Sequence, residues 1–235
     1  MARIDTLNNF LTDIADNLRK HLGTTDVISH SDYDTKIDEV YDAGKQAEYD
    51  NFWDFYQQNG LKPDYNSAFR GWKDELYNPK YPIVCRESAN WSVSEYMFYQ
   101  STITDTKVDI TLPKNQTFKQ GFYGCFWLVT IRKLKVDEST KFSNSFAYCQ
   151  SLVNLEIEGV IGQSYFDLSY SKFLSKESII SVINALSTET SGLTVTLSQT
   201  AVMNAGYFAT PEDWKEWESL IATKPNWTIA LIDKE

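Results

Sequence analysis

The sequence predicts an α/β protein in which a helical module over residues 1–60 precedes a solenoid with a parallel sheet over residues 61–235. Three observations predict this class: helical spacing at the start, alternating strand-like and helix-like runs at the end, and a repeat in the middle. The repeat places one apolar pattern at two positions 24 residues apart: Phe122, Cys125, Leu128 and Ile131, then Phe146, Cys149, Leu152 and Leu155. A fixed period indicates stacked units, each of which buries its apolar face against the next.

The repeated unit has the form FxxCxxLxxI and continues into Glu156 and Ile157. It resembles the irregular leucine-rich repeats of the BspA-like type, in which each short unit contributes one strand to a curved parallel sheet. That resemblance implies a surface for binding and no catalytic activity. Phe98 lies 24 residues before Phe122, with Ser101 in the cysteine position, and Phe69 begins a similar pattern. We therefore expect degenerate units to start at Phe98 and Phe69.

The N-terminal helix is predicted from apolar residues spaced alternately by three and four, Ile4, Leu7, Leu11, Ile14 and Leu18. A stripe of apolar residues this narrow is typical of a helix that packs against other helices. It therefore predicts either self-association, with a homotrimer favoured, or packing on a second helix expected from Ser31 to about Gln58.

The segment from Ile14 to Trp53 resembles an N-terminal module of tail-fibre and other virion proteins from phages of gut bacteria and their prophages. The resemblance implies a virion location and other virion proteins as partners. The first twenty residues hold no apolar run of signal-peptide length, so we expect synthesis in the bacterial cytoplasm without a signal peptide.

Charge and composition narrow the classes of partner. The net charge is −10, and residues 1–60 carry five Lys and Arg against twelve Asp and Glu. An acidic chain without a basic stripe lacks the electrostatic footprint for phosphate backbones or anionic lipid. The sequence therefore predicts no nucleic-acid binding and no membrane insertion.

Residues 49–81 contain ten aromatic side chains. Two interpretations remain open for them: a cap that seals the first unit of the solenoid, or a platform on which sugar rings stack.

The sequence of the C-terminal segment predicts further helices and strands. Ser175 is a candidate N-cap for a helix through Leu186, and residues 193–197 alternate as a strand. Thr210 and Pro211 begin a helix that runs to about Ala222, and residues 226–231 form a final strand. Trp214 and Trp217 are expected to close the core there.

The residues with reactive side chains do not form a recognisable catalytic or metal-binding motif. The three cysteines form no CxxC or CxxH pair, so Cys125 and Cys149 are expected to be buried, reduced thiols. Neither histidine has a neighbour suited to acid–base chemistry. We expect no enzymatic activity, no cofactor and no metal.

Three functions follow from these patterns. The first is a phage or prophage fibre or adhesion component that recognises a host surface protein or glycan. The second is a bacterial leucine-rich-repeat surface adhesin or a general protein- or glycan-binding module, and the third is a glycan-acting enzyme with aromatic subsites. The binding face is predicted at positions that alternate with the apolar ladder on a concave sheet, Lys107, Asp109, Arg132, Glu156, Glu158, Thr194, Thr196 and Thr228.

Overall fold

The computed structural model describes residues 65, 67–74, 77–79, 81–85, 94–163 and 165–235. Expectations for the helical module, including the seam from Ile4 to Leu18, lie outside the described residues. The strands are β1 (Ile83–Val84), β2 (Ile110–Thr111), β3 (Thr130–Val136), β4 (Asn154–Gly159), β5 (Phe166–Leu168), β6 (Leu193–Leu197) and β7 (Trp227–Leu231). The helices are α3 (Lys176–Ala185), α4 (Gln199–Asn204) and α5 (Pro211–Ala222).

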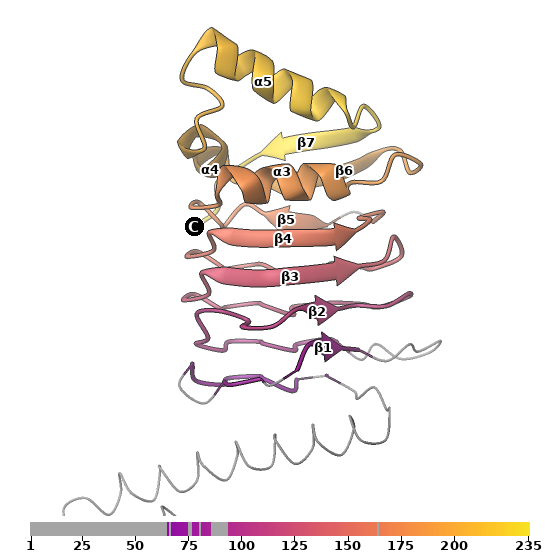
Figure 1. Ribbon diagram of the computed structural model, residues 1–235, viewed down its shortest axis with the longest axis vertical. Coiled ribbons are helices and arrows are strands. Elements are labelled where there is room, and N and C mark those ends of the chain that lie inside the picture. The colour runs from indigo at the N-terminus through magenta and orange to yellow at the C-terminus, as the bar shows by residue number, and fades with distance from the viewer. Residues whose placement is uncertain (1–64, 66, 75–76, 80, 86–93, 164) are drawn as a thin grey trace, which may run out of the picture. The chain divides into compact units, whose positions relative to one another are not determined.

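The strands form two parallel sheets, with the orders β1-β2-β3-β4 and β5-β6-β7 (Figure 1). Successive coils pair in register, so that Ile110 is opposite Leu134 and Thr130 is opposite Asn154, each 24 residues further on. An isolated parallel bridge joins Thr117 to Lys141 at the same offset. The predicted solenoid with a parallel sheet is therefore confirmed.

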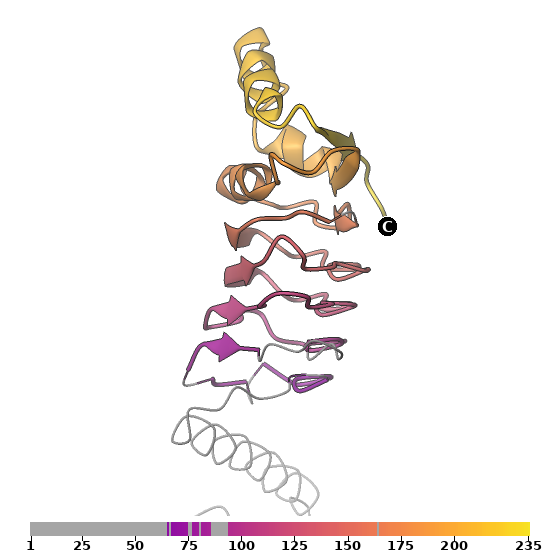
Figure 2. The same cartoon turned by 90° about the vertical axis from the view of Figure 1, so that its right-hand side faces the viewer.

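The side of the coil opposite the first sheet consists of tight turns that stack on one another (Figure 2). A positive φ between 51° and 55° recurs at three positions 24 residues apart, Tyr96, Gln120 and Asn144. Backbone groups in these turns bond to the next coil, as where the Phe98 N–H donates to the Gly121 carbonyl at 2.7 Å. These bonds between coils offset the cost of left-handed backbone at residues other than glycine.

A column of phenylalanine rings fills the interior. Phe98 and Phe122 stack with ring centroids 5.1 Å apart, and Phe122 and Phe146 stack at 5.9 Å. Phe69 continues the column at 4.8 Å from Phe98. These rings are at most 1% exposed, so each coil buries its aromatic side chain between the neighbouring coils, and the degenerate units expected at Phe98 and Phe69 belong to the stack.

Thiol and hydroxyl groups join the coils beside this column. The Cys125 Sγ donates to the Phe98 carbonyl at 2.9 Å, and the Cys149 Sγ donates to the Phe122 carbonyl at 3.1 Å. Ser101 makes the equivalent bond one coil earlier, to the Trp72 carbonyl. Both cysteines are free and buried, as expected. Burial raises the pKa of Cys125 to about 12 and also raises that of Cys149, so both thiols are held protonated.

Helix α3 takes the position that a fifth strand would occupy after β4 (Figures 1 and 2). Two serines on one face of the helix accept hydrogen bonds from the exposed edge of β4. The Leu155 N–H donates to Ser178 Oγ and the Ile157 N–H donates to Ser181 Oγ, each at 2.8 Å. The serine side chains thus replace the carbonyl groups of a neighbouring strand and close this edge.

The C-terminal expectations are largely confirmed. Ser175 caps α3, and Thr210 forms a capping box with Asp213 at the start of α5. Trp217 is 4% exposed and belongs to the core, whereas the prediction for Trp214 is wrong: it is 49% exposed and stacks on Phe208 at 4.3 Å. Trp214 and Trp217 are three residues apart, slightly less than one helical turn, so their side chains diverge by about 60° around the helix axis. Trp217 packs against Tyr207, and Trp214 lies at the border of that buried face.

Candidate functional site

The outward side of the first sheet presents polar and charged side chains, and we call it the polar face. On β3 and β4 it consists of Thr130, Arg132, Lys133, Lys135, Asn154, Glu156 and Glu158. Apolar side chains alternate with them and point into the coil, as Ile131 and Leu155 do. The alternation of apolar and polar residues in the sequence therefore identifies which side chains of these strands are buried and which face outward.

A bulge in β3 enlarges the basic part of the polar face. Ile131 pairs with Leu155 and Leu134 pairs with Ile157, so two residues of β3 lie opposite the single residue Glu156. Arg132 and Lys133 are those two residues, and neither is buried. The extra residue in a bulge re-aims side chains, and here it brings Lys133 to the acidic residues of β4.

Ion pairs between coils compensate most of the charge on the polar face. Arg132 Nε and Nη2 contact the two carboxylate oxygens of Asp105 at 3.0 and 2.6 Å. Lys133 Nζ lies 3.1 Å from Glu156 and 3.3 Å from Glu158. The hydrogen bonds with Glu156 and Glu158 raise the pKa of Lys133, and the bond from Lys133 lowers the pKa of Glu158. The positive and negative charges of the polar face therefore largely cancel.

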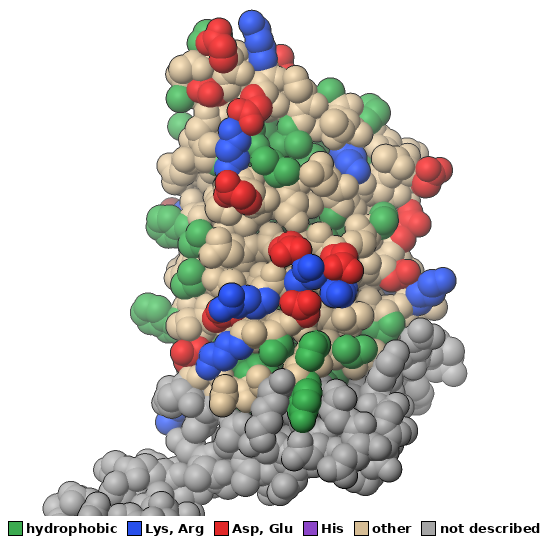
Figure 3. All heavy atoms as spheres, viewed as in Figure 1, with side chains coloured by type: hydrophobic (Ala, Val, Ile, Leu, Met, Phe, Trp, Pro, Cys, Tyr) green, Lys and Arg blue, Asp and Glu red, His purple; other side chains and the backbone are tan. Residues whose placement is uncertain are grey.

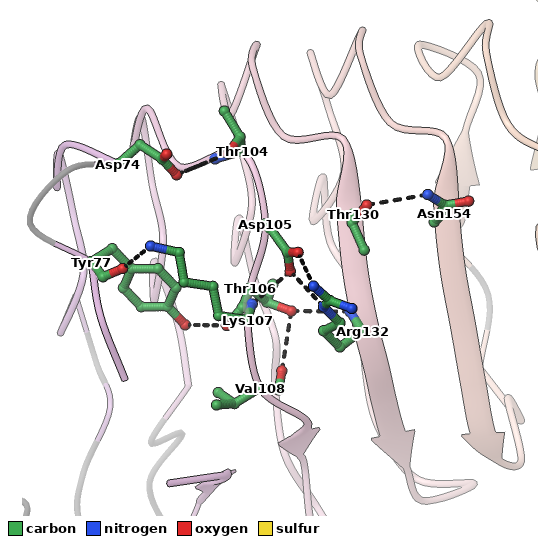
Figure 4. A network of polar contacts seen from close by, with 10 residues as sticks. All are labelled: Asp74, Tyr77, Thr104, Asp105, Thr106, Lys107, Val108, Thr130, Arg132 and Asn154. Carbon is green, nitrogen blue, oxygen red and sulfur yellow. Dashed lines mark hydrogen bonds and ion pairs between the residues drawn. The ribbon is translucent and has the colours of Figure 1, made fainter. Parts of the chain in front are cut away.

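A network of polar contacts joins β3 to the earlier coils (Figure 4). Thr106 Oγ1 accepts from the Arg132 N–H at 3.0 Å and donates to the Val108 carbonyl at 3.1 Å. The Tyr77 hydroxyl donates to the Thr106 carbonyl, and the Lys107 ammonium donates to the Tyr77 carbonyl. Lys107 is thus turned back onto the preceding coil, where its ammonium group stabilises the stack.

An open groove of about 590 Å³ lies where β3, β4 and the start of α3 meet. Hydroxyl, amide, carboxylate and guanidinium groups line it, from Asp105, Thr130, Arg132, Asn154, Glu156, Ser175, Glu177 and Ser181. The Asn154 side chain donates to Thr130 Oγ1 at 3.2 Å, which fixes the amide at the mouth of the groove. The groove can therefore offer both donors and acceptors to a ligand rich in hydroxyl groups.

Exposed apolar side chains lie in the two chain segments that lead into the groove lining. Trp127 is 64% exposed and Val129 is 38% exposed, in the loop that enters β3. Phe173 is 63% exposed, two residues before Ser175 of the groove lining. Figure 3 shows apolar side chains projecting from one edge of the molecule, beside the charged cluster. We call Trp127, Val129 and Phe173 the apolar rim.

The structure divides the predicted binding residues between two surfaces. Arg132, Glu156 and Glu158 lie on the polar face, and Lys107 and Asp109 lie on the coil before it. A second set lies on the other sheet, on β6 and β7: Thr194, Thr196 and Thr228. The cause is α3, which ends the first sheet at β4, so that the later strands continue the opposite side of the coil.

Sequence reasoning missed Lys133, Asn154 and the apolar rim. The bulge that exposes Lys133 could have been found in the sequence, because two polar residues separate Ile131 from Leu134. One residue, Glu156, separates the corresponding positions of the next unit. Trp127 directly precedes the buried ladder residue Leu128, and only the coil geometry shows that its side chain points outward.

Within the described part of the chain, no group of three His, Cys, Asp or Glu side chains is placed to hold a metal ion. The described helices are likewise too short or too polar to cross a bilayer. No protein-family model matches the chain, and no curated protein or solved structure matches it. The polar face, the groove and the coil are therefore the features of the chain that bear on its function.

Proposed function

We propose that this protein is a non-enzymatic recognition protein, a fibre or adhesion component of a phage or prophage virion, that presents the polar face to a host surface. The observation that carries the proposal is the groove beside α3. The groove concentrates donors and acceptors on a rigid stack of coils, and the exposed Trp127 lies three residues before Thr130 of its lining. A site on regular elements whose side chains are fixed by bonds between coils is well suited to selective binding.

The chemistry of the groove favours a glycan as the ligand. Its volume of about 590 Å³ lies within the range of small-ligand sites. The ion pairs of Arg132 with Asp105 and of Glu156 with Lys133 leave Glu177 as the charged lining residue without an ion pair to a described residue, so the groove offers no excess positive charge to an anion. A neutral sugar is bound by groups that form hydrogen bonds with its hydroxyls and by a flat apolar surface. The groove supplies the hydrogen-bonding groups, and the apolar rim supplies the apolar surface.

We further propose that the coil is of the BspA-like leucine-rich type and that residues 1–60 assemble the chain into a homo-oligomer, with a trimer favoured. The parallel register at a 24-residue offset supports the first proposal. Several copies would strengthen weak binding at single sites through effective concentration, by about 10² to 10⁴.

Asn154→Ala and Trp127→Ala should each weaken binding of neutral oligosaccharides by about tenfold, which corresponds to about 1.4 kcal/mol. Asn154→Ala removes a donor and acceptor from the groove, and Trp127→Ala removes the largest apolar surface of the rim. Binding would be measured for the full chain on an array of neutral and charged oligosaccharides, and then on intact gut bacteria.

Trp214→Ala is the matched control, because Trp214 is an exposed tryptophan on α5, which does not line the groove. All three variants should melt within a few degrees of the parent protein. Cell binding that survives both groove variants would contradict the assignment of the site. If both variants abolish binding to cells while the parent protein binds no oligosaccharide on the array, the recognition function stands and the ligand is a protein.

A further inference from the structure

We propose that the outer edge of β7 is a docking site for an extended strand of a partner chain, with apolar residues at alternate positions and a basic residue beside them. This site is separate from the groove of the polar face. It goes beyond the proposed host recognition, because it concerns a partner protein that joins the sheet.

β7 is the last strand of the sheet β5-β6-β7, and its five residues pair without a register shift with β6. Figure 2 shows α5 displaced to one side of the position that a following strand would occupy. Beyond the ladder with β6, the one backbone bond that the described residues make at β7 is from the Trp227 N–H to the Lys224 carbonyl. The other side of β7 therefore presents unpaired backbone groups.

The edges at β4 and at β7, the last strands of the two sheets, differ in how they are covered. At β4, Ser178 and Ser181 accept the backbone N–H groups of the edge. At β7 the sequence Trp-Thr-Ile-Ala-Leu contains no proline or lysine, and the strand contains no bulge. Natural proteins use these devices to prevent strand addition, so an edge without them is suited to accept a strand.

An apolar groove of about 400 Å³ runs along this edge, between β7 and the end of α5. Its apolar lining residues are Ile221, Ala222, Pro225, Trp227 and Ile229. A strand that adds to β7 would place every second side chain on this side of the sheet. Backbone bonds would supply affinity, and the groove would select apolar side chains at alternate positions.

The charge at the groove specifies the rest of the partner. Glu218 and Lys224 are the charged residues of the lining. The Lys224 ammonium is already used, since it donates to the carbonyls of Asn184 and Leu186, and burial lowers its pKa. Glu218 is exposed and makes no ion pair with a described residue. A lysine or arginine in the added strand would complement it.

The same charge disfavours a second copy of β7 as the occupant. Helix α5 carries four acids, Glu212, Asp213, Glu216 and Glu218, against Lys215. Of these acids, Glu216 alone forms an ion pair with a described residue, Lys176. Pairing of two β7 edges about a two-fold axis would bring two acidic helices toward each other, which costs free energy.

The test uses fluorescent peptides of about seven residues, a common strand length, with the full chain. One peptide alternates valine and threonine and ends in lysine, a second replaces the lysine by glutamate, and a third carries a central proline. Fluorescence anisotropy should show binding of the lysine peptide, about tenfold weaker binding of the glutamate peptide, and no binding of the proline peptide.

Glu218→Lys should reverse the preference between the lysine and glutamate peptides. Its side chain is exposed on a helix, so the fold is retained. Ile229→Lys should abolish binding by placing a charge in the apolar groove, whereas Ile232→Lys, just beyond β7, should leave it unchanged.

Lack of binding by the lysine peptide, or binding that Ile229→Lys and Glu218→Lys leave unaltered, would overturn the proposal. A dimer in sedimentation that Ile229→Lys converts to monomer would also overturn it, because the occupant would then be a second copy. None of these measurements depends on a glycan.

Discussion

Phe122→Ala should lower the free energy of unfolding by about 3 to 5 kcal/mol, the range for loss of a buried phenylalanine side chain. The ring is fully buried and lies between those of Phe98 and Phe146, with Phe118 at its edge at 5.3 Å. Its removal would open a cavity that the neighbouring coils cannot fill, because their hydrogen bonds fix the spacing between them. Urea unfolding followed by circular dichroism measures the loss.

Phe126→Ala is the matched control. Phe126 lies in the same coil, four residues away, but is 46% exposed and contacts Tyr148 at the surface. It should cost less than about 1 kcal/mol, as is usual for surface substitutions. Equal losses for the two variants would mean that Phe122 is not inside a stack.

Ser178→Ala should cost about 1 to 3 kcal/mol, because it leaves a buried backbone N–H of β4 without an acceptor. Ser178 is 3% exposed, and its hydroxyl both accepts from the Leu155 N–H and donates to the Val153 carbonyl at 2.9 Å. Alanine has the higher helix propensity, so propensity alone would predict a gain. A loss of stability in Ser178→Ala would therefore show that the serine closes the edge of β4, whereas a gain would show that helix propensity dominates.

Ser219→Ala on α5 provides the comparison, since Ser219 is an exposed helical serine. It should leave stability unchanged or raise it by a few tenths of a kcal/mol. In hydrogen exchange, the Leu155 amide should lose protection in Ser178→Ala and keep it in Ser219→Ala. A stabilised Ser178→Ala variant with a protected Leu155 amide would contradict the closing role of α3.

The repeated pattern made the stack predictable from sequence. Phe122 and Phe146 lie at one period and are neighbours in the stack, as the spacing requires. A second column at the same period, Phe118, Phe142 and Phe166, is equally visible in the sequence but was not predicted. The replacement of a strand by α3 was not predictable, because the pattern around Ser178 indicates a helix without indicating which edge it covers.

The candidate site was predictable in part, because side chains alternate between the two faces of a strand. Alternation along β4 placed Glu156 and Glu158 outward, and the structure agrees. Alternation fails at the bulge, which exposes Lys133. It also says nothing about which sheet a strand joins, so Thr194 and Thr228 were assigned to a surface that α3 separates from them. Exposure of Trp127 depends on the path of the coil, which one sequence does not reveal.

The most direct test of the stack is a disulfide between Thr130→Cys and Asn154→Cys. These residues pair across β3 and β4, 24 residues apart in the chain, and the spacing of neighbouring strands suits a disulfide. The native cysteines are buried and do not compete. On mild oxidation of the double variant, the stack predicts near-complete formation of this bond, detected by peptide mass spectrometry. The pair Thr130→Cys with Glu158→Cys, displaced by four residues or about 13 Å along the strand, should stay reduced. Equal crosslinking of the two pairs, or none in the first, would contradict the parallel coil on which the groove and both proposed binding sites depend.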